Sequence, residues 1–84
     1  MAQFTYKTKG VCSREIDITV ENGIIEKVVY HGGCSGNTQG VAALVVGMTV
    51  EEAIKRLSGI RCGLKSTSCP DQLSVALQEY LEAN

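Results

Sequence analysis

The sequence predicts an α+β fold, in which a three-stranded antiparallel sheet is followed by about three helices packed on one face. In the first third, polar and apolar residues alternate, as they do in half-buried strands. In the rest, apolar residues recur at helical spacing behind recognisable helix starts. With 84 residues, of which 44% are hydrophobic, the chain can bury one modest core. We therefore expect a single domain over residues 1–84.

Three short segments make up the predicted sheet. Gln3 to Lys9 is short and carries two aromatic residues, which suits an edge strand. Glu15 to Val20 alternates strictly between polar and apolar residues, and Ile25 to His31 returns along it as the third strand. We expect one face of this sheet to be buried and the other to face water.

The turn between the second and third strands is a strong local signal. Asn22-Gly23 favours a two-residue hairpin, because both central residues of such a turn need positive φ. This turn predicts that Val20 lies opposite Ile25 and that Ile16 lies opposite Val29.

The first two helices are predicted from apolar spacing and from their ends. The first runs from Thr38 and stops at Gly47. Its apolar residues are Val41, Ala42, Leu44, Val45 and Met48. The second opens at Thr49, where Thr-Val-Glu-Glu forms a capping box, and runs through Leu57.

The last helix follows a loop predicted over residues 60–67. Pro70 suits its first turn, where a missing N–H costs nothing. Its apolar stripe consists of Leu73, Ala76, Leu77, Tyr80 and Leu81.

Composition excludes several classes of function. A net charge of −1 provides no basic face for nucleic acid, and no apolar run approaches the length of a membrane span. The first ten residues lack the apolar segment of a secretory signal. We therefore expect a cytoplasmic protein that binds neither nucleic acid nor membrane.

Four cysteines, Cys12, Cys34, Cys62 and Cys69, are the unusual feature of the sequence. In a reducing cytoplasm such a set indicates metal or redox chemistry rather than disulfides. All four fall in predicted loops or at the ends of elements, where ligands from distant segments can converge. The plain alternative is that some of them pack in the core as small hydrophobic residues.

Helix ends add a chemical reason for metal binding. Cys34 and Cys69 both precede predicted helical turns, whose N–H groups stabilise a thiolate. Four thiolates are a common ligand set for structural zinc. Because 21, 27 and 6 residues separate successive cysteines, no CxxC pair supports this by spacing. We predict that all four cysteines ligate one metal ion.

Two other polar residues stand near these cysteines. His31, three residues before Cys34, competes as a ligand, although a histidine at a strand end is more often a surface or turn residue. Asp71 is expected to accept the amides of the last helix's first turn. No Ser-His-acid set or phosphate loop is present, so we predict no catalytic or cofactor-binding residue.

The motif Thr67-Ser68-Cys69-Pro70-Asp71, together with GVCSREI, HGGCSGNTQG and IRCGLKSTSCPDQL, resembles the small stand-alone TSCPD-domain proteins. That family is marked by four cysteines and is similar to a segment near the C-terminus of vitamin B12-dependent ribonucleotide reductases. The resemblance implies a cysteine-based metal or redox element. It does not imply that this chain alone reduces nucleotides.

A more distant likeness is to the NifU/IscU-type iron–sulfur scaffolds. It is carried by the hairpin Glu21–Glu26, by Gly33-Cys34-Ser35-Gly36 and by the segment Gly47–Ala53. On that comparison Cys12, Cys34 and Cys69 would match the three scaffold cysteines. This chain departs from the scaffold pattern at Arg14, where an Asp is expected, and at Ser68, where a His is expected. The additional Cys62 favours a more closed site.

Three functions follow as expectations. The first is a zinc-binding accessory module related to ribonucleotide reductase. The second is an iron–sulfur cluster scaffold or carrier. The third is a thiol–disulfide partner that passes electrons to a reductase through Cys62 and Cys69. The expected partner is therefore a reductase or the iron–sulfur machinery, and the sequence leaves the oligomeric state open.

Overall fold

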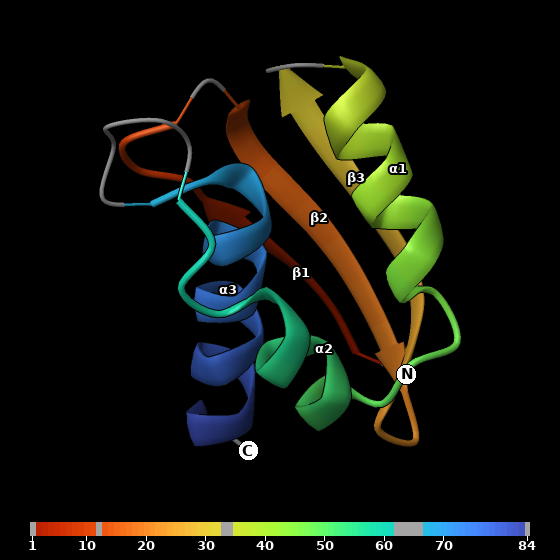
Figure 1. Cartoon of the computed structure of the whole chain (residues 1–84). Coiled ribbons are helices and arrows are strands. Elements are labelled where there is room, and N and C mark those ends of the chain that lie inside the picture. The colour runs from red at the N-terminus through yellow and green to blue at the C-terminus, as the bar shows by residue number, and fades with distance from the viewer. Residues whose placement is uncertain (1, 12, 33–34, 62–66, 84) are drawn as a thin grey trace.

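The computed structural model describes residues 2–11, 13–32, 35–61 and 67–83. The elements in chain order are β1 (Ala2–Lys7), β2 (Ser13–Glu21), β3 (Ile24–Gly32), α1 (Ser35–Val45), α2 (Val50–Leu57) and α3 (Cys69–Ala83) (Figure 1). The α+β fold predicted from the sequence is confirmed.

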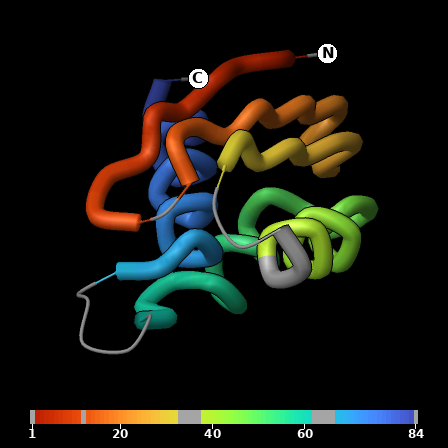
Figure 2. The backbone as a smooth tube through the Cα atoms, turned by 90° about the horizontal axis from the view of Figure 1, so that it is seen from above, coloured from red at the N-terminus to blue at the C-terminus, as the bar shows by residue number. Residues whose placement is uncertain are grey.

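The three strands form one antiparallel sheet in the order β1-β2-β3. Seen from above, the helices lie on one face of this sheet (Figure 2). The buried hydrophobic residues lie between the two layers. They are Ile16, Ile18, Val20, Ile25, Val28, Val45, Val50, Ala53, Leu73, Ala76 and Leu77.

The β2–β3 hairpin turns at Asn22 and Gly23, both of which have positive φ (53° and 77°). Val20 lies opposite Ile25, as the sequence predicts. The predicted pairing of Ile16 with Val29 is wrong, because Ile16 pairs with Tyr30.

A bulge in β3 explains this difference. Val20 pairs with Ile25 and Thr19 pairs with Lys27, which leaves Glu26 as an extra residue on β3. One extra residue reverses the alternation of side chains beyond it. Tyr30 therefore turns toward the helices.

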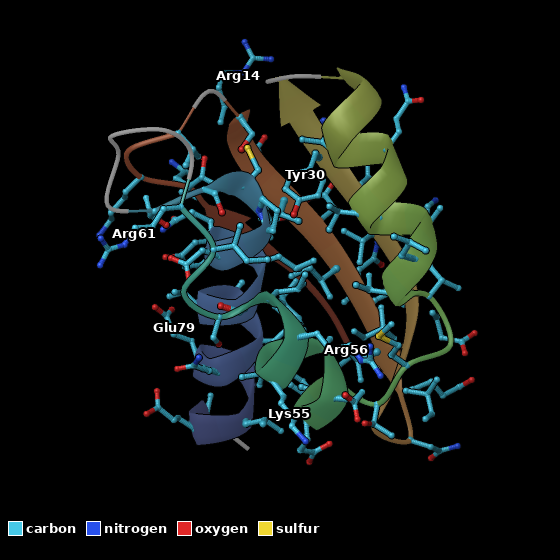
Figure 3. The ribbon with its side chains drawn as sticks, in the orientation of Figure 1. Arg14, Tyr30, Lys55, Arg56, Arg61 and Glu79 are labelled. Atoms are coloured by element: carbon cyan, nitrogen blue, oxygen red, sulfur yellow. The ribbon has the colours of Figure 1, made fainter. Side chains whose placement is uncertain are left out.

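A second bulge lies at the start of β2. Ser13 pairs with Gly32 and Glu15 pairs with His31, so that Arg14 is the extra residue. Strict alternation from the buried Ile16 would direct Arg14 inward and Ser13 outward. The bulge reverses both. Ser13 is 3% exposed, and Arg14 points away from the molecule (Figure 3).

The segment between α1 and α2 pairs with the start of β3. Ile25 N–H donates to the carbonyl of Met48, and Gly47 N–H donates to the carbonyl of Ile25, both at 2.9 Å. The chain therefore leaves α1 beside the hairpin. The N-cap of α2 is Thr49, whose hydroxyl accepts a hydrogen bond from Glu52 N–H at 3.1 Å, which confirms the threonine half of the predicted capping box. The Glu52 carboxylate instead accepts a hydrogen bond from Arg56.

The first helix differs from its prediction in two ways. It begins at Ser35 rather than Thr38 and ends at Val45, which leaves Met48 outside it. Leu44, predicted on the apolar face, is 73% exposed. Val41 and Val45 are about one helical turn apart, so they share a helix face and both pack against the core. Leu44 lies beside that face rather than on it.

The last helix carries its predicted stripe over most of its length. Leu73, Ala76 and Leu77 are buried, whereas Leu81 is exposed. Tyr80 stacks on Phe4 of β1, with ring centroids 5.1 Å apart, which fastens α3 to the sheet edge. Within the described ranges, no helix has the length and apolar character needed to cross a membrane.

Candidate metal centre

Cys69 is the first residue of α3 and is 9% exposed. Its Sγ lies 3.3 Å from the hydroxyl oxygen of Ser13, which opens β2. Its backbone carbonyl accepts a hydrogen bond from the hydroxyl of Tyr30 at 2.9 Å. Both strands of the hairpin therefore hold this cysteine at the end of the sheet.

The start of α3 is capped by Ser68. The Ser68 hydroxyl accepts a hydrogen bond from Asp71 N–H at 3.1 Å and donates one to the carbonyl of Ile60 at 2.6 Å. A serine followed three residues later by an acid is a helix-start pattern. The cap holds the first turn of α3 and so fixes the direction in which the Cys69 side chain points.

The prediction that Asp71 caps the last helix is wrong. Its carboxylate accepts hydrogen bonds from Gly59 N–H at 2.7 Å and from the Thr67 hydroxyl at 2.6 Å. Because Ser68 caps the helix, the Asp71 carboxylate is left to bind Gly59, in the chain that follows α2. It fastens residues on both sides of the segment 62–66, which lies outside the described residues.

The loop after β1 reaches the same end of the molecule. Lys9 N–H donates to the side-chain oxygen of Gln72 in the first turn of α3 at 2.9 Å. A Cβ atom at Gly10 would lie 3.3 Å from the Thr67 side chain, and Gly10 has φ of +73°. In the upper part of Figure 1, β3 ends and β2 and α1 begin at the top, while β1 ends and α3 begins somewhat lower on the left.

Of the four predicted ligands, Cys69 alone lies within the described ranges. Cys12, Cys34 and Cys62 lie outside them. Among the residues that the structure describes, no three His, Cys, Asp or Glu side chains are grouped closely enough to hold a metal ion. The convergence of the four cysteines therefore stays a prediction.

His31 lies on the outer face of the sheet. Its Nε2 is 2.7 Å from the carboxylate of Asp17, and both side chains are about two-fifths exposed. Tyr30, its neighbour on β3, points instead to the helix side (Figure 3) and reaches Cys69. The histidine and the cysteine therefore stand on opposite faces of the sheet.

Burial shapes the chemistry of the Tyr30 hydroxyl. Desolvation raises its pKa well above the ordinary value, and the negative charge of a Cys69 thiolate raises it further. Tyr30 is therefore a neutral hydrogen-bond donor at physiological pH, as its bond to the Cys69 carbonyl requires.

Sequence reasoning missed Ser13, Tyr30 and Ser68. The spacing of Ser68 and Asp71 is a signal that could have identified the cap. Ser13 and Tyr30 face the helices because each lies beyond a bulge, and neither bulge has a marker in the sequence.

This arrangement defines a class of protein: a small α+β domain with a buried thiol in the first turn of its last helix. The TSCPD domain family matches residues 3–81, and the chain belongs to that family. The chain has no match among the curated proteins and none among the solved structures. The likeness to NifU/IscU scaffolds stays a prediction.

Proposed function

We propose that this chain binds a zinc ion through the thiolates of Cys12, Cys34, Cys62 and Cys69. The observation that carries the proposal is the 3.3 Å contact between Ser13 Oγ and Cys69 Sγ. Ser13 directly follows Cys12 in the sequence, and consecutive Cα atoms lie about 3.8 Å apart. The contact supports a common site for the first and last cysteines.

The end of β3 supports including Cys34. Gly32, two residues earlier, pairs with Ser13 across the sheet. Paired antiparallel residues have Cα atoms about 5 Å apart. The chain therefore enters residues 33–34 from beside the Ser13–Cys69 contact, and α1 begins at the next residue, Ser35.

The chain after α2 supports including Cys62. The carbonyl of Ile60, two residues earlier, accepts the hydrogen bond from Ser68, which directly precedes Cys69. The polypeptide thus enters residues 62–66 from the capped end of α3 and returns to it at Thr67. The described residues on either side of 62–66 therefore lie at one place, which supports a ligand from this segment there.

The chemistry of the ligand set fits zinc. Four thiolates form a closed tetrahedral site with Zn–S bonds of about 2.3 Å. Such a site would link four segments of a chain with a small core and so stabilise its fold. We propose a cytoplasmic location, since a reducing compartment keeps cysteines available as ligands.

For the biological role we propose an accessory module of a ribonucleotide reductase. The support is the resemblance of the four-cysteine pattern to the C-terminal segment of vitamin B12-dependent reductases. The chain by itself is expected to turn over no ribonucleotide. Conversion by the purified chain above that of a variant with all four cysteines changed to serine would contradict this.

The test is elemental analysis and absorption spectroscopy of protein purified without oxygen. We expect one zinc per chain and no visible absorption, because Zn²⁺ is a d¹⁰ ion. The variant with four Cys→Ser changes is the control and should carry no zinc.

Two other results would replace the proposal. Brown protein with iron and sulfide would favour an iron–sulfur scaffold or carrier. Metal-free protein with a reversible Cys62–Cys69 disulfide, seen by thiol titration with and without reductant, would favour electron transfer.

A further inference from the structure

We infer that Ser13 is a positioning residue for the Cys69 thiolate, holding its sulfur through a hydrogen bond while the metal is bound. This inference rests on the proposed zinc site and deepens it. It adds to the four ligands one hydroxyl group that controls how firmly the last of them holds the metal.

The placement of Ser13 is the first argument. The extra residue Arg14 reverses the alternation of β2 and turns the Ser13 side chain from the water-facing side to the helix side. Bulges often serve to re-aim one side chain at a site. Here the re-aimed hydroxyl lies 3.3 Å from Cys69 Sγ and is almost fully buried.

The backbone around Ser13 is fixed on two sides. The Thr8 hydroxyl donates to the Ser13 carbonyl at 2.5 Å, and Thr8 N–H donates to the Arg14 carbonyl at 3.1 Å. Gly32 pairs with Ser13 from the opposite strand. The backbone that carries the hydroxyl is therefore held in place without a metal.

The chemistry gives this hydroxyl one role when the thiolate is a ligand. In the thiol form, either Ser13 or Cys69 can donate the hydrogen bond. A metal-bound thiolate has no proton, so Ser13 must donate. That bond fixes the orientation of Sγ, as outer-shell partners of metal ligands do, and it lowers the energy of the sulfur lone pairs.

The test uses the full chain loaded with Co²⁺ without oxygen. Without the hydroxyl, the sulfur lone pairs rise in energy. The sulfur-to-cobalt charge-transfer band of Ser13→Ala should therefore move to longer wavelength, and metal transfer to a chelator should become about tenfold faster. Ser13→Thr keeps the hydroxyl and should restore both values.

The matched control is Ser74→Ala. Ser74 is a fully buried serine of α3 whose hydroxyl donates to the Asp71 carbonyl. Ser74→Ala is the same chemical change, made in the helix that carries Cys69, and we expect the charge-transfer band to stay in place. If Ser13→Ala does not fold, Ser13→Thr is compared with Ser13→Val, because valine has the shape of threonine but no hydroxyl.

The outcomes separate the two proposals. Equal band positions and equal transfer rates with and without the hydroxyl overturn the role of Ser13 and leave the zinc site standing. A wild-type chain that takes up neither Co²⁺ nor Zn²⁺ overturns the proposed function and the role of Ser13 together.

Discussion

The Ser68 hydroxyl donates to the carbonyl of Ile60 at 2.6 Å, while it caps the helix that begins at Cys69. One buried side chain therefore closes the N-terminus of α3 and fastens to it the chain that follows α2. The direction of the Cys69 side chain and the path of the chain after α2 therefore both depend on the Ser68 hydroxyl.

We expect Ser68→Ala to lower the free energy of unfolding by about 1–2 kcal/mol, because it removes an N-cap and leaves a carbonyl without its partner. The matched control is Ser58→Ala. Ser58 is exposed at the end of α2, where its hydroxyl donates to the Ile54 carbonyl, and its loss should cost about 0.5 kcal/mol or less. Urea denaturation of both variants checks the difference, and equal costs would contradict it.

The hairpin turn gives a second prediction. Asn22→Ala together with Gly23→Val should destabilise the fold by about 2 kcal/mol or more, because both positions need positive φ. A Cβ at Gly23 meets nothing within 4 Å, so a steric clash of the Cβ does not add to the backbone strain.

The control for the hairpin variant is Gly40→Ala in α1. Gly40 also has open space at its Cβ position, and its φ is not positive. There alanine should stabilise the helix by up to about 1 kcal/mol. Thermal melting of both variants tests the contrast, and a hairpin variant that melts like the wild type would show that the turn assignment is wrong.

The four cysteines give a third prediction, which depends on the proposed zinc site. Cys12→Ser and Cys69→Ser should lower bound zinc and melting temperature to a similar extent, because a hydroxyl is a poor zinc ligand and each variant removes one ligand of four. Zinc content and thermal melting are measured on the same samples. A large loss of zinc at one of the two positions and none at the other would exclude a single shared site.

Asp17 gives a prediction about pH. Hydrogen bonds from Thr5 and from His31, in that order, hold its pKa below the ordinary value of 3.8. A lowered pKa in the folded state contributes stability that is complete above the ordinary value. This stability is lost as the pH falls through the lowered pKa.

Asp17→Asn should therefore be less stable than the wild type near pH 6, and the gap should narrow as the pH falls toward about 3. Thr5→Val, which removes the larger cause, should reproduce part of the effect. Urea unfolding over this pH range measures the gap. A gap that stays constant with pH would mean that the carboxylate contributes nothing through its charge.

Much of the fold was predictable because its signals are local. The alternation of Glu15 to Val20 marks a strand, Asn22-Gly23 marks a turn, and Thr49 with Glu52 marks a helix start. Each signal rests on the backbone preferences of a few adjacent residues, which tertiary packing did not override here.

The candidate site was predictable in part. The motif around Cys69 led to the TSCPD domain family, whose match over residues 3–81 confirms the resemblance. The sequence also placed Cys69 at a helix start, where the structure has it. The predicted helix cap at Asp71 and the predicted place of Leu44 on the apolar face were wrong, because each depends on which distant segment lies beside the residue.

By itself the sequence determined the order of strands and helices, the hairpin and the family, since these follow from short-range spacing and from a motif of adjacent residues. The tertiary structure alone decided that Ser13 meets Cys69 across 56 positions of the chain. That contact needs a bulge at Arg14 and the docking of α3 against the end of the sheet. Both depend on the free energy of packing the whole chain, which no short segment encodes.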